Sequence, residues 1–137
     1  AREIPLADGS VSFVFVDPPY STHLEYSGDE NCIGRLDAAG GAYYEAMDKV
    51  FAQIARILKP GGHAAIYVSD SFKKGKTFQP IGFELFERMR RRLEPVDIVA
   101  VTRHNKSLKL GNWHRAAAEG NFFLRGFNYL FLFRKPD

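Results

Sequence analysis

Hydrophobic positions along the chain follow two periods, one typical of strands and one typical of helices. Val11–Val16 is a β-branched and aromatic run that follows Asp8-Gly9-Ser10 and stops at two prolines, so it predicts a strand. The run has little polar alternation, which predicts a strand covered on both faces, as in a parallel sheet. Residues 63–69 (HAAIYVS) and 96–102 predict two further strands.

Two segments between these strands have the spacing of amphipathic helices. Residues 43–58 carry apolar side chains three and four positions apart, and Lys59-Pro60-Gly61-Gly62 then predicts the end of the helix. A second helix is predicted from Pro80, a residue suited to a first helical turn, up to Glu94-Pro95. The apolar positions are Tyr43, Met47, Val50, Phe51, Ile54 and Leu58 in the first helix and Ile81, Leu85, Phe86, Met89 and Leu93 in the second.

Phe127–Arg134 predicts a last strand with apolar residues on both faces, which places it centrally in the sheet. The order strand, helix, strand, helix, strand, strand predicts one α/β domain over residues 1–137, with a last strand that returns antiparallel. The connections 18–42 and 104–126 are long. Ligand sites of open α/β sheets lie beyond the carboxyl ends of strands, and the first of these connections starts at such an end.

Composition narrows the class of protein. The apolar runs are strand-sized, far below the roughly 20 residues of a membrane span, and the first residues lack the pattern of a leader, so we expect a cytoplasmic protein without a membrane partner. Cys32 stands alone and the 4 histidines are scattered, so we expect neither a disulfide nor a metal site. A net charge of +3 identifies no partner by itself.

The most specific signal is the motif that follows the first strand, Asp17, Pro18, Pro19 and Tyr20. It resembles the catalytic motif of S-adenosylmethionine-dependent amino methyltransferases that act on adenine N6 or cytosine N4 of DNA. The helix end at Lys59-Pro60-Gly61-Gly62 and the run Phe127-Asn128-Tyr129-Leu130-Phe131 resemble that family as well. The resemblance implies the C-terminal half of a Rossmann-like class I methyltransferase sheet with helices packed on it. An ordinary strand-ending turn is the alternative interpretation of the motif.

The resemblance assigns a role to each residue of the motif. The Asp17 carboxylate and the Pro18 carbonyl would accept the two hydrogens of an exocyclic amine, whose lone pair would then point at the methyl group of the donor. The tandem prolines restrict the backbone around these acceptors. Tyr20 would stack on a base that has left the duplex. Asp17 and Pro18 are also the residues of this chain expected near the S-adenosylmethionine.

Three other groups of polar residues have competing interpretations. In the loop 104–126, Lys106, Lys109, Trp113 and Arg115 fit a surface that follows phosphates and stacks on bases, and equally a solvated loop with a buried tryptophan. The cluster Arg88, Arg90, Arg91 and Arg92 favours a solvated helix face. Asp70, after the second strand, could face the site, although its sequence context favours a turn.

The family holds its methyl donor with a glycine-rich loop after a strand, and neither Gly40-Gly41 nor Gly61-Gly62 follows one. The donor-binding, N-terminal half of the domain is therefore the expected partner of this chain, beside nucleic acid. Without that half, Val11–Val16 would be an exposed edge strand that favours self-association.

Three functions remain open from the sequence. The first is site-specific DNA methylation at adenine N6 or cytosine N4, as in restriction-modification. The second is methylation of guanine N2 in RNA, because some RNA guanine-N2 methyltransferases resemble this chain in the same Asp-Pro-Pro-Tyr pattern. The third is an inactive half-domain that binds nucleic acid.

Overall fold

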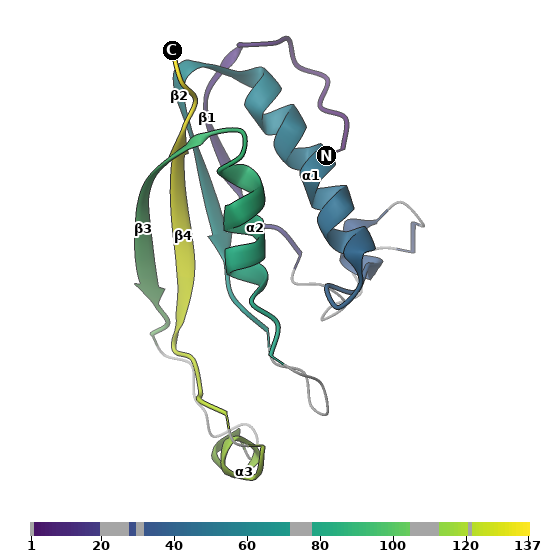
Figure 1. The fold of residues 1–137 in the computed structure, drawn as a ribbon, viewed down its shortest axis with the longest axis vertical. Helices are drawn as coiled ribbons and strands as arrows, with labels where there is room; N and C mark the ends of the chain where they lie inside the picture. Colours follow the sequence, from purple (N-terminus) through teal and green to yellow (C-terminus); the bar gives the residue numbers. More distant parts are fainter. Residues whose placement is uncertain (1, 20–27, 30–31, 72–77, 105–112, 121) are drawn as a thin grey trace.

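A computed structural model of the chain describes residues 2–19, 28–29, 32–71, 78–104, 113–120 and 122–137 (Figure 1). A four-stranded sheet in the order β1-β2-β4-β3 carries two helices. The strands are β1 (Val11–Val16), β2 (Leu58–Val68), β3 (Glu94–Thr102) and β4 (Phe127–Arg134). The helices are η2 (Ile33–Arg35), α1 (Gly41–Ile57), α2 (Ile81–Met89) and α3 (Trp113–Glu119).

The topology confirms the predicted α/β fold. β1 and β2 are parallel, whereas β4 is antiparallel to both of its neighbours, β2 and β3. β4 is central, as its two apolar faces predict, and β1 is an edge strand. The self-association expected of that edge stays a prediction. None of the described helices combines the length and the hydrophobicity needed to cross a membrane.

The second strand starts at Leu58, earlier than the predicted residue 63. Leu58 is paired with Val11 of β1, and Gly61 takes the left-handed conformation (φ 71°) expected of a glycine that ends a helix. The Gly61 N–H donates to the Lys135 carbonyl at 3.0 Å, and the Lys135 N–H donates to the Gly62 carbonyl at 2.8 Å. The Pro-Gly-Gly segment therefore belongs to the sheet because the last residues of the chain pair with it.

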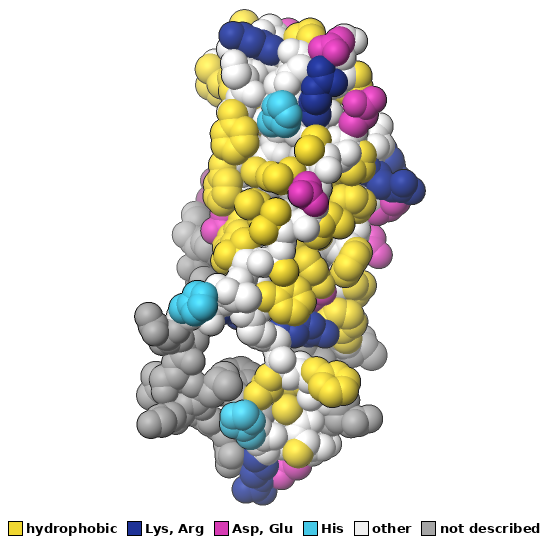
Figure 2. All heavy atoms as spheres, turned by 90° about the vertical axis from the view of Figure 1, so that its left-hand side faces the viewer, with side chains coloured by type: hydrophobic (Ala, Val, Ile, Leu, Met, Phe, Trp, Pro, Cys, Tyr) yellow, Lys and Arg dark blue, Asp and Glu magenta, His cyan; other side chains and the backbone are white. Residues whose placement is uncertain are grey.

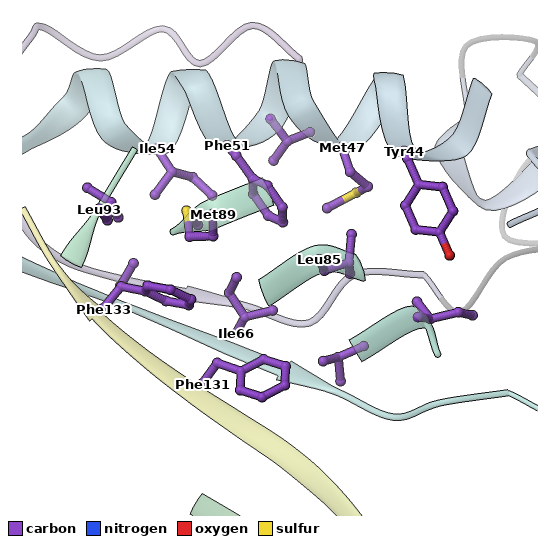
Figure 3. Packing of buried hydrophobic residues seen from close by; sticks show 14 of the residues in the cluster. Tyr44, Met47, Phe51, Ile54, Ile66, Leu85, Met89, Leu93, Phe131 and Phe133 are labelled. Carbon is purple, nitrogen blue, oxygen red and sulfur yellow. The ribbon is translucent and has the colours of Figure 1, made fainter. Parts of the chain in front are cut away.

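The core lies between α1, α2 and one face of the sheet (Figure 3). Phe51 of α1 and Met89 of α2 are fully buried against this face, which presents Ile66, Phe131 and Phe133. The aromatic rings on β4 and α2 contact one another, with 5.1 Å between the centroids of Phe86 and Phe131. Phe131 and Phe133 thus form the core side of a strand whose two faces were predicted to be apolar.

The opposite face of the sheet carries no helix among the described residues. Phe13 and Phe15 of β1 are 56% and 58% exposed, so the prediction that this strand is covered on both faces is wrong for this chain. Phe15 stacks on Tyr67 of β2, with ring centroids 6.4 Å apart. We call Phe13, Phe15, Tyr67, Val99, Leu130 and Leu132 the uncovered face, and Figure 2 shows hydrophobic side chains over much of this side.

α2 is shorter than predicted, because it ends at Met89 and residues 90–93 form a turn before β3. Pro80 is its N-cap residue rather than its first helical residue. The start of α2 is held by Asp70, whose Oδ1 accepts the Gly82 N–H at 2.9 Å and whose Oδ2 accepts the Tyr129 hydroxyl at 3.1 Å. A Cβ at position 82 would lie 2.8 Å from Tyr129 Cδ2, so any side chain there would force the Tyr129 ring to move.

One of the four clustered arginines does not lie on a solvated face. Arg88 forms a salt bridge with Asp48 and lies over the ring of Tyr44, so it joins α2 to α1. Arg90 and Arg91 are exposed in the turn that follows α2 and pair with Glu87 of that helix, so they are solvated as predicted although they lie beyond the helix. The short helices η2 and α3 were not predicted.

Replacement of Phe131 by Ala is expected to lower the free energy of unfolding by about 3–5 kcal/mol, because the fully buried ring leaves a cavity. Phe123, which is 91% exposed, is the matched control, and Phe123→Ala should change the stability little. Urea unfolding followed by circular dichroism measures both, and equal losses would contradict this description of the core.

Replacement of Asp70 by Asn is expected to lower the pKa of Tyr129. Burial is the larger cause that raises this pKa above its usual value, and the Asp70 carboxylate is the next. The substitution removes the effect of the carboxylate and leaves the effect of burial. Because the pKa of Tyr129 is higher in the folded state than in the unfolded state, Tyr129 stabilises the folded state below about pH 10. This stabilisation is lost as the pH rises through the folded-state pKa. Carbon-13 NMR of the Tyr129 ring measures the titration. Asp97→Asn is the control, and an unchanged titration in Asp70→Asn would refute the assigned cause.

Candidate functional site

The predicted site lies at one edge of the sheet, where three strands end. β1, β2 and β3 run parallel to one another because each of the last two is antiparallel to β4. Their carboxyl ends, followed by Asp17, Ser69 and Arg103, therefore meet at the edge where β4 begins. This confirms the expectation that the first long connection starts at the carboxyl edge of the sheet, the usual place of ligand sites in α/β folds.

A hydrogen bond from α1 holds the described part of the motif. Asp17 is exposed, Pro18 is buried and Pro19 is half-buried. The Tyr43 hydroxyl, in the first turn of α1, donates a hydrogen bond to the Pro19 carbonyl at 2.8 Å. Tyr20 lies outside the described residues, so its stacking role stays a prediction, as do the roles of Asp17 and Pro18.

Tyr43 was predicted only as an apolar position of the first helix. Its side chain is fully buried, and its ring meets that of Tyr44 edge to face with centroids 5.1 Å apart. Burial and, second, the charge of Glu84 raise the pKa of Tyr44. The sequence offered one indication of this contact. A tyrosine at a buried helical position needs a hydrogen-bond partner for its hydroxyl.

Asp70 follows β2 at the same edge, and both of its carboxylate oxygens accept the hydrogen bonds from Gly82 and Tyr129. The sequence favoured a turn at this residue over a side chain that faces the site. The structure gives it a structural role, because it anchors the start of α2 to β2 and β4.

Several cations lie at or beyond this edge, and three of them have described partners. Arg103 Nε donates to Asn128 Oδ1 at 2.7 Å, and the Arg125 guanidinium lies over the Phe78 ring, 4.2 Å from its centroid. Arg115 of α3 forms a salt bridge with Glu119 at 2.6 Å. These pairings neutralise or orient the cations, and the half-buried Arg125 keeps its charge because its described partner is an aromatic ring rather than a carboxylate.

The loop predicted to bind nucleic acid is only partly described. Lys106 and Lys109 lie outside the described residues. Trp113 begins α3, and Arg115 is exposed on that helix, which lies beyond the carboxyl edge of the sheet (Figure 1). The role of this loop stays a prediction.

The described glycines with a positive φ lie away from the motif. These glycines are Gly9 and Gly61, and both lie at the amino edge, before β1 and at the start of β2. The motif lies at the opposite edge. Among the described residues, no group of three or more His, Cys, Asp or Glu side chains could hold a metal ion.

No protein-family model matches the sequence, and no curated protein is significantly similar to it. Solved structures do match. TTHA0409 of Thermus thermophilus, a proposed DNA modification methylase, is 22% identical with a TM-score of 0.68 over 97% of this chain and 48% of its own. The same protein complexed with S-adenosyl-L-methionine is 21% identical, with a TM-score of 0.67 over 97% of this chain and 51% of its own.

Two further solved structures, a DNA methyltransferase and a cyclase, have a similar fold. PvuII DNA methyltransferase, which is cytosine-N4-specific, is 17% identical with a TM-score of 0.67 over 97% of this chain and 46% of its own. The [4+2]-cyclase SpnF is 16% identical with a TM-score of 0.53 over 98% of this chain and 54% of its own. The chain thus spans about half the length of these proteins, and its four-stranded α/β fold is similar to class I methyltransferase folds.

Proposed function

We propose that this chain is the catalytic half of an S-adenosylmethionine-dependent methyltransferase that acts on DNA, at adenine N6 or cytosine N4. The observation that carries the proposal is the position of Asp17, Pro18 and Pro19 at the carboxyl end of β1, in the fold described above. Fold alone does not identify a reaction, since the cyclase SpnF has a similar one. The motif is what points to an amino group as the acceptor.

An exocyclic amine on a base ring is a poor nucleophile because its lone pair is delocalised into the ring. The Asp17 carboxylate and the Pro18 carbonyl offer two acceptors for the two amino hydrogens, which favours a pyramidal nitrogen with a directed lone pair. Pro18 and Pro19 lack N–H groups, so no backbone donor of theirs competes for these acceptors. S-adenosylmethionine would supply the methyl group.

The target base has to leave the duplex to reach acceptors at the edge of a sheet. Tyr20 would then stack on the face of the base, and Lys106, Lys109, Trp113 and Arg115 would contact the flanking strand. α3, which carries exposed residues, lies beyond the carboxyl edge of the sheet, where such a strand could pass (Figure 1).

We also propose that residues 1–137 form a partial domain that a donor-binding half completes. The uncovered face supports this, because its contiguous apolar side chains, among them Phe13 and Phe15, lack a second layer among the described residues. This chain covers 48% and 46% of the two DNA methylase structures, so the rest of such a protein could supply that layer. The donor would be held mainly by the complementing half, since the left-handed glycines described here lie at the wrong edge.

Asp17→Ala in the full-length gene product is expected to lower kcat on the order of 100-fold with little change in DNA binding, because the acceptor acts mainly in the transition state. Methyl transfer from labelled S-adenosylmethionine to DNA and fluorescence anisotropy measure the two quantities. Asp137→Ala is the control, since its carboxylate pairs with Arg134 at the opposite edge. Normal turnover in Asp17→Ala would show that the motif is only a turn.

In the same assays, Tyr20→Phe should keep most activity, whereas Tyr20→Ala should lose roughly 1–3 kcal/mol of stacking.

The 137-residue chain alone is expected to bind S-adenosylmethionine weakly or not at all, because its described glycines form no donor-binding turn at the carboxyl edge. Isothermal titration calorimetry measures this directly. Micromolar binding by the isolated chain would contradict the proposal that a second half holds the donor.

A further inference from the structure

The hydrogen bond between α1 and the motif links a buried helix residue to the backbone that would accept the substrate hydrogen. The Tyr43 hydroxyl donates to the Pro19 carbonyl at 2.8 Å across 24 residues of sequence. The Tyr43 ring is fully buried in the core cluster, whereas Pro19 is half-buried at the edge of the sheet. The motif is therefore attached to the helical layer as well as to its own strand.

Few torsions separate this hydrogen bond from the Pro18 carbonyl. The Pro18–Pro19 peptide is planar, and the ring of Pro19 restricts φ to about −65°. The torsion left free between the Pro18 carbonyl and the Pro19 carbonyl is ψ of Pro19. A hydrogen bond that holds the Pro19 carbonyl restrains this torsion, and so it restrains the direction of the Pro18 carbonyl.

We propose that Tyr43 is a positioning residue, which aims the Pro18 carbonyl at the amino group of the target base through its hydrogen bond to Pro19. This inference rests on the proposed function. The position of Tyr43 suits the task, because its hydroxyl donates from a fully buried side chain whose packed ring has little freedom to move. Tyr43 touches neither base nor donor in this scheme and acts only through the backbone.

A purely structural hydrogen bond would have a different signature. Its loss would lower the stability of the protein and leave turnover per folded molecule unchanged. Loss of a positioning bond lowers kcat, since a small misplacement of a reacting group is costly, and leaves KM in place because the base still stacks on the site.

The test compares Tyr43→Phe with Tyr44→Phe in the full-length gene product. Both variants remove one hydroxyl from neighbouring buried positions of α1 and keep the ring, including the Tyr44 ring below Arg88. In methyl-transfer assays with DNA we expect Tyr43→Phe to lower kcat on the order of tenfold with KM unchanged. Tyr44→Phe should keep the parent kcat, and thermal unfolding should show that both variants are folded.

Equal kcat values for Tyr43→Phe and the parent would overturn the inference and leave the proposed function intact. A parent protein that methylates no nucleic acid would instead refute the proposed function. The carbonyl carbon resonances of Pro18 and Pro19, observed with carbon-13-labelled proline, then decide the positioning step. Their displacement in Tyr43→Phe alone supports the inference, and unchanged resonances overturn it.

Discussion

The burial of aromatic and aliphatic side chains between two helices and one face of the sheet is the interaction on which the other features depend. Phe51 and Met89 reach this layer from different helices and belong to the same buried cluster as Phe131 of β4. Burial of large apolar side chains is the dominant favourable term in folding, and here it fixes α1 and α2 above the same strands. The two polar contacts at the carboxyl edge, from Tyr43 and from Asp70, are possible only because the helices are fixed in this way.

The strands that the sequence predicted correctly are those with a local pattern. Val11–Val16 and Phe127–Arg134 have the predicted bounds because β-branched and aromatic runs end at turn residues. The start of β2 was missed because Gly61 and Gly62 join the sheet through Lys135, a partner far away in the sequence. No local pattern encodes that pairing.

The same difference between local and distant contacts applies to the candidate site. The motif from Asp17 to Tyr20 is contiguous, so its resemblance and its place after a strand could be found from the sequence. Tyr43 looked like an ordinary core position, since nothing near it in the sequence shows that its hydroxyl reaches Pro19. Arg88 looked like a surface charge for the same reason, because its partner Asp48 lies on the other helix.

The crowded contact between Gly82 and Tyr129 has an evolutionary consequence. The ring of Tyr129 occupies the space that any side chain at position 82 would need, and the Asp70 carboxylate bonds to both residues. A lineage that replaces this glycine has to shrink or move the aromatic ring at position 129 as well, and it then gives up the hydroxyl that Asp70 accepts. Position 129, which lies far from positions 70 and 82 in the sequence, is therefore coupled to position 82 by steric contact and to position 70 by a hydrogen bond, and a substitution at position 129 is expected to affect both.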